Sequence, residues 1–339
     1  MGQNKKIVII NSEKISENEG YYSCDNIDMK SIPEGLSKNF DIFFIAKKSN
    51  IKRSHRINLR KIKIVSNIFS FISAIINTFK NRDTKYLLVS ITPYVFFSYI
   101  LLFIFRKKIF VYLRSSGHEE YKAKLGFIGY LFYHVMYSCV TFKSKIISCQ
   151  KRLVKNKDYD LVFPSELDAR WFENISKPTL DIPRILYVGR IRVEKGIFSF
   201  LKMFSKINTN IKLSIVGKSE DLKITSNNIN LVGFIADTTQ LIKNYDQHNI
   251  TVLPSFTEAH PKVVDESLAR GRPVIIFEEI KHIEKKFGIF VSKRNVESLL
   301  ETIQNIMNSY DEIQKKIKKN KLPTKKEFIL GISNILTKQ

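Results

Sequence analysis

Short continuous runs of Val, Ile, Leu and Phe alternate with longer amphipathic segments along most of the chain. Such runs predict strands of a parallel sheet buried on both faces, and the segments between them predict helices that cover it. The pattern is clearest between residues 184 and 309, where it predicts a doubly wound α/β domain. We expect strands there at 184–188, 212–216, 229–231, 250–253 and 273–277, and helices at 195–207, 238–245, 261–270 and 296–309.

The first half of the chain shows the same rhythm less sharply, and two α/β domains are predicted, residues 1–170 and residues 171–322. Between them, Pro178 and Pro183 flank a polar stretch typical of a linker. Residues 323–339 are too few for a domain, and we expect them to return as a helix onto the first domain. In the first half we expect strands at 5–10, 41–46, 86–90, 109–113 and 145–148, and helices at 62–79, 94–105 and 125–140.

The composition is that of a globular protein with an unusual charge. Of 339 residues, 44% are hydrophobic and 26% charged, which excludes a disordered or fibrous chain. The net charge is +24; residues 1–175 hold 29 Lys and Arg against 15 Asp and Glu, so the excess is not confined to a tail. A positive field attracts nucleic acid, anionic lipid headgroups and nucleotide diphosphates alike. A general bias toward Lys, Ile and Asn explains the charge equally well.

The cysteines and apolar stretches bear on the compartment. Cys24, Cys139 and Cys149 form no CxxC pair, so a disulfide framework or zinc site is not expected and a reducing cytosol is the simpler assumption. The apolar run at 7–10 is too short for a secretory signal. The stretches 93–105 and 125–142 suit buried or interfacial helices better than a span of about 20 residues. Aromatic residues beside basic clusters here predict a peripheral contact with an anionic membrane, at the inner face of the cytoplasmic membrane.

The first candidate site follows the strand expected at 184–188. Gly189 permits a turn there, and Arg190 and Lys195 follow at the mouth of the next helix. Ligands of open α/β sheets bind beyond the carboxyl ends of the strands, and a helix N-terminus favours anions. An Arg and a Lys at this point suit a diphosphate. Taken alone, they are equally typical of solvated charges on a surface loop.

The second candidate site follows the strand expected at 250–253. Glu258 is expected in the loop before a helix that begins at Pro261, where a missing N–H costs nothing. Glu266 is expected more than one turn inside that helix, so that both acids can face one site at different depths. Carboxylates accept hydrogen bonds from vicinal sugar hydroxyls. The alternative is a capping acid at 258 and a solvated acid at 266. The stretch 269–273 predicts only a helix end and a plain loop.

Together these motifs resemble a known family, the retaining glycosyltransferases with the GT-B fold, often called family 4. The resemblance is strong over 184–277; residues 145–150 and 162–168 are similar to the family's domain-linking strand and turn, and the rest of the first half shares only its α/β rhythm. It implies two Rossmann-like doubly wound domains facing a central cleft. The motifs that carry it are VGR-x4-KG at 188–196, VG at 216–217, GF at 233–234 and PS-x2-E-x2-P-x4-E-x2-ARGRPVI at 254–276.

The resemblance implies a role for each of these residues. Arg190 and Lys195 would bind the donor diphosphate and stabilise charge on the leaving group, Glu258 would contact the donor sugar, and Glu266 would contact the ribose. Two cations and a helix N-terminus supply the countercharge, so neither a metal nor a cofactor is expected. Retention of anomeric configuration is implied by the resemblance alone. The further residues expected to face the sugar and phosphates are Gly189, Ala259, His260, Pro261, Lys262 and Val263.

The chain departs from the family pattern in two places. The turn after Glu258 usually carries Gly and a large apolar residue, whereas here it is Ala259-His260, which leaves the sugar specificity open. The glycine-rich loop usual after the first strand is reduced to Gly20, in a loop expected at 11–21 that would meet the donor phosphates or the acceptor.

Arg114 and His118 stand in a polar stretch after the strand expected at 109–113, where the family often places residues that face the cleft. Arg114 would bind substrate, and His118 would contact the transferred sugar or help to orient the acceptor. A histidine on a solvent-exposed loop is the alternative.

These observations predict a glycosyltransferase that moves a sugar from a nucleotide-diphosphate sugar to a hydroxyl of a glycan or lipid-linked glycan. The expected setting is biosynthesis of a cell-surface polysaccharide, such as lipopolysaccharide, O-antigen or capsule, and nucleic acid is not an expected partner. A basic nucleic-acid-binding α/β protein is the alternative, although no helix-turn-helix, zinc-finger or RNP signature is present. A nicotinamide-dependent oxidoreductase would need a strand-linked GxGxxG, which the sequence lacks.

Overall fold

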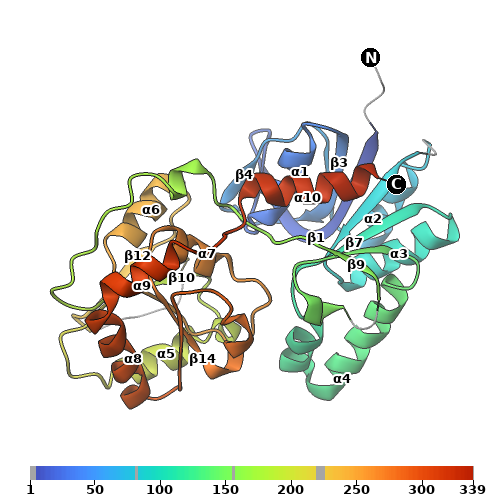
Figure 1. The fold of residues 1–339 in the computed structure, drawn as a ribbon. Helices are drawn as coiled ribbons and strands as arrows, with labels where there is room; N and C mark the ends of the chain where they lie inside the picture. Colours follow the sequence, from blue (N-terminus) through green and yellow to red (C-terminus); the bar gives the residue numbers. More distant parts are fainter. Residues whose placement is uncertain (1–4, 81–82, 155–156, 219–225, 339) are drawn as a thin grey trace. The chain divides into compact units, whose positions relative to one another are not determined.

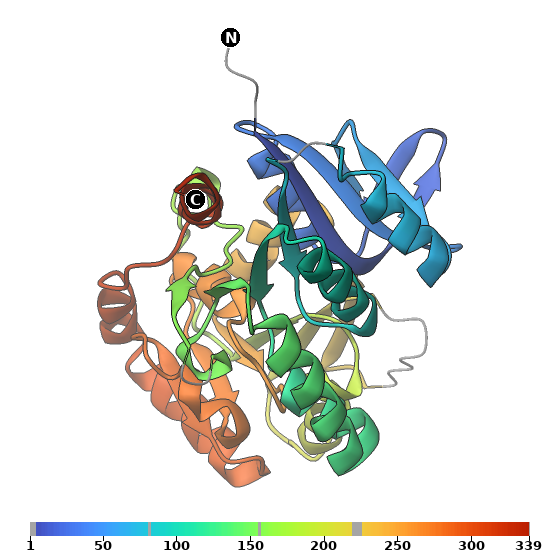
Figure 2. The ribbon, with the colours of Figure 1, turned by 90° about the vertical axis from the view of Figure 1, so that its right-hand side faces the viewer.

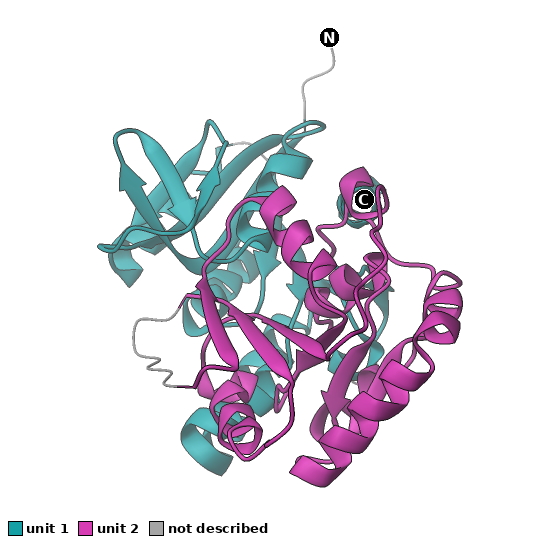
Figure 3. Ribbon diagram, turned by 90° about the vertical axis from the view of Figure 1, so that its left-hand side faces the viewer, with its two compact units in different colours: residues 1–164, 325–339 teal, residues 165–324 magenta. Residues whose placement is uncertain are grey.

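The computed structural model describes residues 5–80, 83–154, 157–218 and 226–338. The chain divides into two compact units, residues 1–164 with 325–339 and residues 165–324 (Figure 3). The division lies at 164/165 rather than at the expected 170. The reason is that Leu167 and Trp171 are buried in a core cluster of the second unit.

A parallel sheet forms the centre of the first unit, in the order β5-β3-β1-β6-β7-β8-β9. Figure 1 labels β1, β3, β7 and β9 of this sheet. The chain reverses its direction across this sheet between β1 and β6, which is the arrangement of a doubly wound fold. The far end of β1 leaves the sheet and pairs antiparallel with β2, which pairs in turn with β4. The strands are β1 (Lys6–Asn18), β2 (Tyr21–Cys24), β3 (Asp41–Lys48), β4 (His55–Ile57), β5 (Ile62–Val65), β6 (Lys85–Val89), β7 (Lys108–Leu113), β8 (Lys145–Ser148) and β9 (Tyr159–Leu161).

Two expectations for the first unit are wrong. The loop expected at 11–21 is the second half of β1 and the turn of a hairpin, because Ile15 is buried in the core and Ser16 pairs with β2. The helix expected at 62–79 is strand β5 followed by α2 (Ile68–Ile76). Asn67 starts α2 with a reciprocal capping box to Ser70, which separates the two elements.

Helices cover both faces of the first sheet. On one face α2, α3 (Pro93–Ile104) and α4 (Gly117–Val140) share a core cluster with β1, β6 and β7. On the other, α1 (Asp28–Leu36) contacts α10 (Lys325–Thr337), and the ring of Phe328 in α10 meets Tyr112 of β7. Buried Lys85 donates a hydrogen bond to the carbonyl of Leu336 in the last turn of α10, so a cation lies where the helix dipole favours it. The C-terminal segment is therefore part of the first unit. Figure 2 shows this segment, in red, end-on at the label of the C-terminus.

The second unit is a parallel sheet in the order β12-β11-β10-β13-β14-β15. The chain reverses its direction across the sheet between β10 and β13, and this switch point is where ligands of doubly wound folds bind. The strands are β10 (Arg184–Val188), β11 (Lys212–Val216), β12 (Ile229–Gly233), β13 (Ile250–Leu253), β14 (Val274–Phe277) and β15 (Ile289–Ser292). The helices are α5 (Ile197–Phe204), α6 (Thr238–Asp246), α7 (Lys262–Ala269), α8 (Val296–Asn308) and α9 (Tyr310–Ile317).

The chain just before the linker expected at 178–183 is held in place by two fully buried arginines of the second unit. Arg270 binds the carboxylate of Asp246 at 2.7 Å and donates to main-chain carbonyls at 171, 173 and 174. Arg272 donates to the carbonyl of Ser176 at 3.0 Å. The stretch 269–273 is therefore more than the plain loop expected there, because its guanidinium groups fix the path of residues 171–176.

Candidate functional site

The candidate site lies in two loops that follow β10 and β13 in the second unit. These strands are parallel neighbours, so their carboxyl ends open at the same edge of the sheet. The N–H of Phe256 donates to the carbonyl of Glu194 at 3.1 Å, which ties the loops together. Gly196 has a φ of +65°, and a Cβ at this position would lie 1.9 Å from the carbonyl oxygen of Pro254. Only glycine permits this approach.

An ion pair joins the two loops at their centre. The Nζ of Lys195 lies 2.5 Å from Oε1 of Glu258, and both side chains are largely buried. The hydroxyl of Ser255 donates to the same oxygen at 2.8 Å, and Nε2 of His282 donates to the main-chain carbonyl of Glu258 at 2.8 Å. A partly buried charge-assisted hydrogen bond is stronger than an exposed one. The structure thus brings together the cation and the acid that the sequence places 63 residues apart.

Arg190 begins the same loop, with an exposed side chain. Its carbonyl accepts a hydrogen bond of 2.8 Å from the hydroxyl of Tyr187 in β10. Burial raises the pKa of Tyr187, and the negative charge of Glu258 raises it further, so this hydroxyl stays protonated. Gly189 lies against the same ring, because a Cβ there would be 3.0 Å from the tyrosine oxygen. Tyr187 therefore sets the backbone turn from which Arg190 projects.

Glu266 lies inside α7 and is buried, which excludes the solvated acid that the sequence left open. Its Oε2 accepts a hydrogen bond of 2.9 Å from the hydroxyl of Tyr245. Burial raises the pKa of Glu266 to about 7; the hydrogen bond from Tyr245 and the positive charge of Lys262 oppose the rise, and the acids Glu166 and Asp265 add to it. The carboxyl therefore titrates near neutral pH.

His260 lies in the loop beside Glu258 and is anchored by an acid. Its Nε2 lies 3.0 Å from Oδ2 of Asp265, and the ammonium of Lys286 contacts Oδ1. Burial favours the neutral form of Asp265, but the hydrogen bond from His260 and the charge of Lys286 outweigh it and lower the pKa of Asp265. The imidazole is thus held in one orientation at the place where the family usually has an apolar residue.

The other residues predicted for this site lie around the start of α7. Pro261 is the N-cap of α7 and not its first residue, because its ψ is 111°. Ala259 is buried, whereas Lys262 and Val263 in the first turn are half-buried. The N-terminus of α7 directly follows the loop that carries Glu258, and the first turn of a helix favours an anionic ligand.

In the first unit, Arg114 and Gly20 have surroundings different from those expected. Arg114 forms a buried ion pair with Asp28, and its guanidinium also donates to Oδ1 of Asn26 at 3.0 Å. These bonds hold the start of α1, so the guanidinium is already engaged by the protein. Gly20 forms the β1–β2 hairpin turn with Glu19, and both have a positive φ. A substrate-binding role for either stays a prediction.

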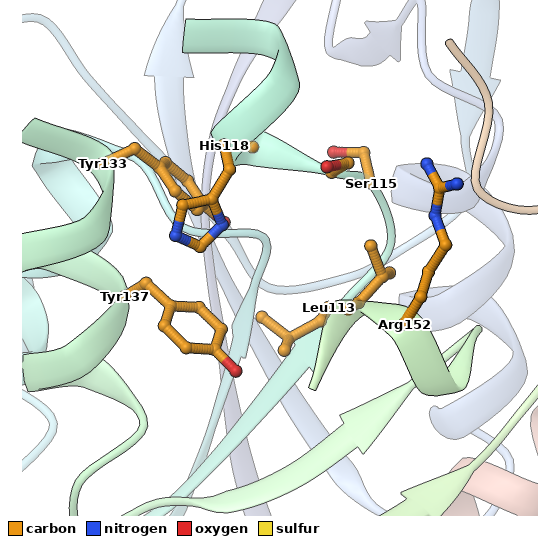
Figure 4. A pocket seen from close by; sticks show the side chains of 9 residues that line it. Leu113, Ser115, His118, Tyr133, Tyr137 and Arg152 are labelled. Atoms are coloured by element: carbon orange, nitrogen blue, oxygen red, sulfur yellow. The ribbon is translucent and has the colours of Figure 1, made fainter. Parts of the chain in front are cut away.

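His118 lines a small pocket at the end of β7 (Figure 4). Its Nε2 lies 3.2 Å from Nδ1 of His134, and the rings of Tyr133 and Tyr137 pack edge-on against it. The cavity volume is about 30 Å³, enough for one or two water molecules and too small for a sugar ring. His118 is thus part of an aromatic cluster and not a residue on an exposed loop.

Three residues that brace the site were not predicted. His282 and Lys286 come from the segment after β14, and Arg294 follows β15. Arg294 donates to the carbonyl of Pro254 at 2.9 Å and lies over the ring of Phe256, 4.4 Å from its centroid. In the sequence these three residues show only as basic positions in the segments that follow β14 and β15, which does not reveal what they bind. Among the described residues, no group of three or more His, Cys, Asp or Glu is placed to hold a metal ion.

Sequence comparison with known proteins identifies similarity in the second unit. Residues 182–309 match the family model of glycosyl transferases group 1. The matched segment contains both loops of the candidate site. An uncharacterized glycosyltransferase of Haemophilus influenzae is 24% identical over 188 residues, 48% of this chain and 53% of the relative. One of Methanocaldococcus jannaschii is 30% identical over 147 residues, 38% of this chain and 37% of the relative. The alignments thus span about half and about a third of these relatives, and they support a glycosyltransferase.

Solved structures match nearly the whole chain. Sucrose-phosphate synthase from Thermosynechococcus elongatus has a TM-score of 0.72 at 16% identity and covers 98% of both chains. Anabaena HepE in complex with UDP and glucose has a TM-score of 0.71 at 11% identity and covers 99% of this chain and 100% of its own. The lipopolysaccharide outer core galactosyltransferase WaaB has a TM-score of 0.62 at 13% identity, with 98% and 100% covered. At such identities the likeness concerns the fold, which is GT-B with two Rossmann-like units.

Proposed function

We propose that the protein transfers a sugar from a nucleotide-diphosphate sugar to a hydroxyl of a glycan or lipid-linked glycan. The observation that carries the proposal is the Lys195–Glu258 pair at the switch point between β10 and β13. It puts a cation and an acid at the edge of the sheet where ligands of this fold class bind. HepE, which was crystallised with UDP and glucose, supports this donor class.

In the proposed reaction, the acceptor oxygen forms a bond to the anomeric carbon of the donor while the bond from that carbon to the diphosphate oxygen breaks. The nucleoside diphosphate leaves with the bonding electron pair, and the hydroxyl proton passes to the leaving group or to solvent. Lys195, Arg190 and the N-terminus of α7 would stabilise the charge that develops on the diphosphate. This countercharge comes from the chain itself, so we propose that no metal takes part.

The two acids have separate proposed roles. Glu258 pairs with Lys195 and would accept hydrogen bonds from hydroxyls of the donor sugar. Glu266 lies deeper in α7, beside Tyr245, and would accept hydrogen bonds from the ribose. His260, fixed by Asp265, would donate to the sugar and contribute to the choice of donor.

We also propose the stereochemical outcome of the reaction and the biosynthesis in which it takes part. Retention follows from the resemblance of residues 184–277 to the family 4 enzymes. Synthesis of a cell-surface polysaccharide, such as lipopolysaccharide, O-antigen or capsule, is the proposed setting, and the structural likeness to the galactosyltransferase WaaB supports it. A lipid-linked acceptor would bring the protein to the cytoplasmic face of an anionic membrane.

The proposal is tested by thermal unfolding of the full chain with UDP, GDP, NAD+ and a DNA oligonucleotide in parallel. A ligand that binds only the folded state stabilises it by about 2.7 kcal/mol at about 100 times its dissociation constant. We expect UDP or GDP to raise the Tm, and NAD+ and DNA to leave it unchanged. Stabilisation by DNA alone or by NAD+ alone would remove the proposal.

Matched lysine variants locate the effect. Lys195→Ala should abolish the shift given by the nucleoside diphosphate, because it removes the cation at the switch point. Lys206→Ala, an exposed residue beyond the opposite end of α5, should retain the full shift. Equal loss in both variants would mean that general positive charge, and not this site, binds the nucleotide.

A further inference from the structure

The second half of α4 presents an uninterrupted apolar face to solvent. Leu125 and Gly126 have non-helical backbone angles, and Gly126 has a φ of +62°, so a second helical segment begins at Phe127. Phe127 and Ile128 are 68% and 77% exposed. The exposed apolar residues of this segment, one helical turn apart on one face, are Phe127, Ile128, Leu131, Phe132 and Val135, and we call them the α4 face.

The opposite side of the same helical segment packs into the core of the first unit, whereas the α4 face does not. Tyr133, Met136, Tyr137 and Val140 are buried in the core of the first unit. None of the residues of the α4 face belongs to that core. Single exposed apolar residues are common on protein surfaces, whereas a contiguous apolar patch marks an interaction site. Figure 1 shows α3 beside α4, which it contacts, and α3 also has exposed apolar residues, among them Phe97, Phe103 and Ile104.

The charges around the α4 face have one sign. Residues 121–150 contain no Asp or Glu, and residues 51–150 hold 17 Lys and Arg against three Asp and Glu. Exposed Lys122 and Lys124 precede the segment, and Lys143 follows it. An uncharged apolar helix face with lysines at both ends is the pattern of a helix that lies in the interface of an anionic bilayer. The described helices include none long and apolar enough to cross a bilayer.

We propose that the α4 face docks the first unit onto an anionic lipid surface, with the helix lying in the plane of the headgroups. The apolar side chains would enter the boundary between headgroups and acyl chains, and the flanking lysines would bind lipid phosphates. The proposal deepens the membrane contact of the proposed function by naming the surface that makes it. Its test does not use sugar transfer, so the two proposals fail separately.

The test is sedimentation of the full chain with phosphatidylcholine vesicles, with and without phosphatidylglycerol, at low salt. We expect binding to the anionic vesicles only. Phe127→Gln/Ile128→Gln should lower the partition coefficient at least about tenfold, because it removes two of the most exposed apolar side chains without changing the charge. Ile51→Gln/Leu330→Gln, which alters exposed apolar residues elsewhere in the first unit, should bind like the wild type.

The electrostatic part is tested by Lys122→Gln/Lys124→Gln, which should lower binding to the anionic vesicles about tenfold. Far-UV circular dichroism checks that each variant is folded. Unchanged binding of Phe127→Gln/Ile128→Gln, or no binding of the folded wild type, would overturn the proposal. Light scattering that shows a wild-type dimer, and a monomer for Phe127→Gln/Ile128→Gln, would also overturn it, because a second copy would then cover the α4 face.

Discussion

Replacing Glu266 with glutamine should change how the stability of the second unit depends on pH. The wild-type carboxyl is buried in α7, and its pKa rises from an ordinary value of 4.5 to about 7. The folded state therefore binds a proton more tightly than the unfolded state. Between these two pKa values the folded state holds more protons, so stability falls as the pH rises from about 4.5 through about 7. Glutamine has no such titration and can still accept the hydrogen bond from Tyr245.

The magnitude follows from the two pKa values. Each tenfold change in proton affinity corresponds to about 1.4 kcal/mol. The ionised Glu266 carboxyl therefore costs the folded state about 2.5 kcal/mol at a pH of about 8, relative to a pH of about 5. We expect Glu266→Gln to gain about that much stability over the wild type on going from the acidic to the alkaline condition.

The single tryptophan of the chain makes the measurement specific to the second unit. Trp171 is buried in a core cluster of that unit, and its ring meets Tyr245, the hydrogen-bond partner of Glu266. Urea unfolding followed by tryptophan fluorescence gives the free energy of unfolding of wild type and variant at each pH. Subtracting one from the other removes the titration of every other group.

A constant difference in unfolding free energy between wild type and Glu266→Gln across this pH range would refute the reasoning. It would mean that Glu266 is solvated or stays ionised at all these pH values. A difference that grows in the opposite direction, with the wild type gaining at high pH, would mean that a cation pairs with the carboxylate more closely than the structure shows.

Three further results are expected from the same geometry. Gly196→Ala should destabilise the second unit by about 1–3 kcal/mol in urea unfolding and reduce nucleoside diphosphate binding, because its Cβ meets the carbonyl of Pro254. Arg270→Met should cost about 3–5 kcal/mol in the same assay, since it leaves buried carbonyls without a donor and removes the nearer of the two cations that pair with Asp246. Asp265→Asn should raise the donor KM roughly tenfold with a smaller change in kcat, because it removes the carboxylate that orients His260. Steady-state kinetics measures both constants, and the reference variant His260→Ala should give a similar KM.

The strands and helices of the second unit were predictable because each strand is one short apolar run bounded by Gly, Pro or a charge. The strands at 184–188, 212–216 and 250–253 have the bounds expected, and β12 and β14 differ from theirs by two residues and one residue, whereas β15 was not predicted. In the first unit the same reasoning missed the second half of β1. Residues 11–14 are polar and span a register shift, and the strand is continued by pairing of Lys14 with β3 and of residues 16–18 with β2. Such pairing depends on contacts distant in sequence, which periodicity does not report.

The candidate site was predictable to a similar degree. Lys195 and Glu258 were expected to serve one donor site because the family resemblance assigns both to it, and the structure places their side chains in contact. The burial of Glu266 was one of two open alternatives. The contacts that Lys286, His282 and Arg294 make with the site could not be predicted, because the sequence shows them only as basic residues in connecting segments. What they bind depends on how those segments return over the loop after β13.

The most direct test of the central claim is sugar transfer from a mixed pool of nucleotide sugars, with released nucleoside diphosphate as the readout. Wild type and Lys206→Ala should release a nucleoside diphosphate, whereas Lys195→Ala and Glu258→Ala should lose at least about 100-fold in kcat/KM while remaining folded. Release by Lys195→Ala and Glu258→Ala at the wild-type rate would show that the pair joining the loops after β10 and β13 does not carry the reaction.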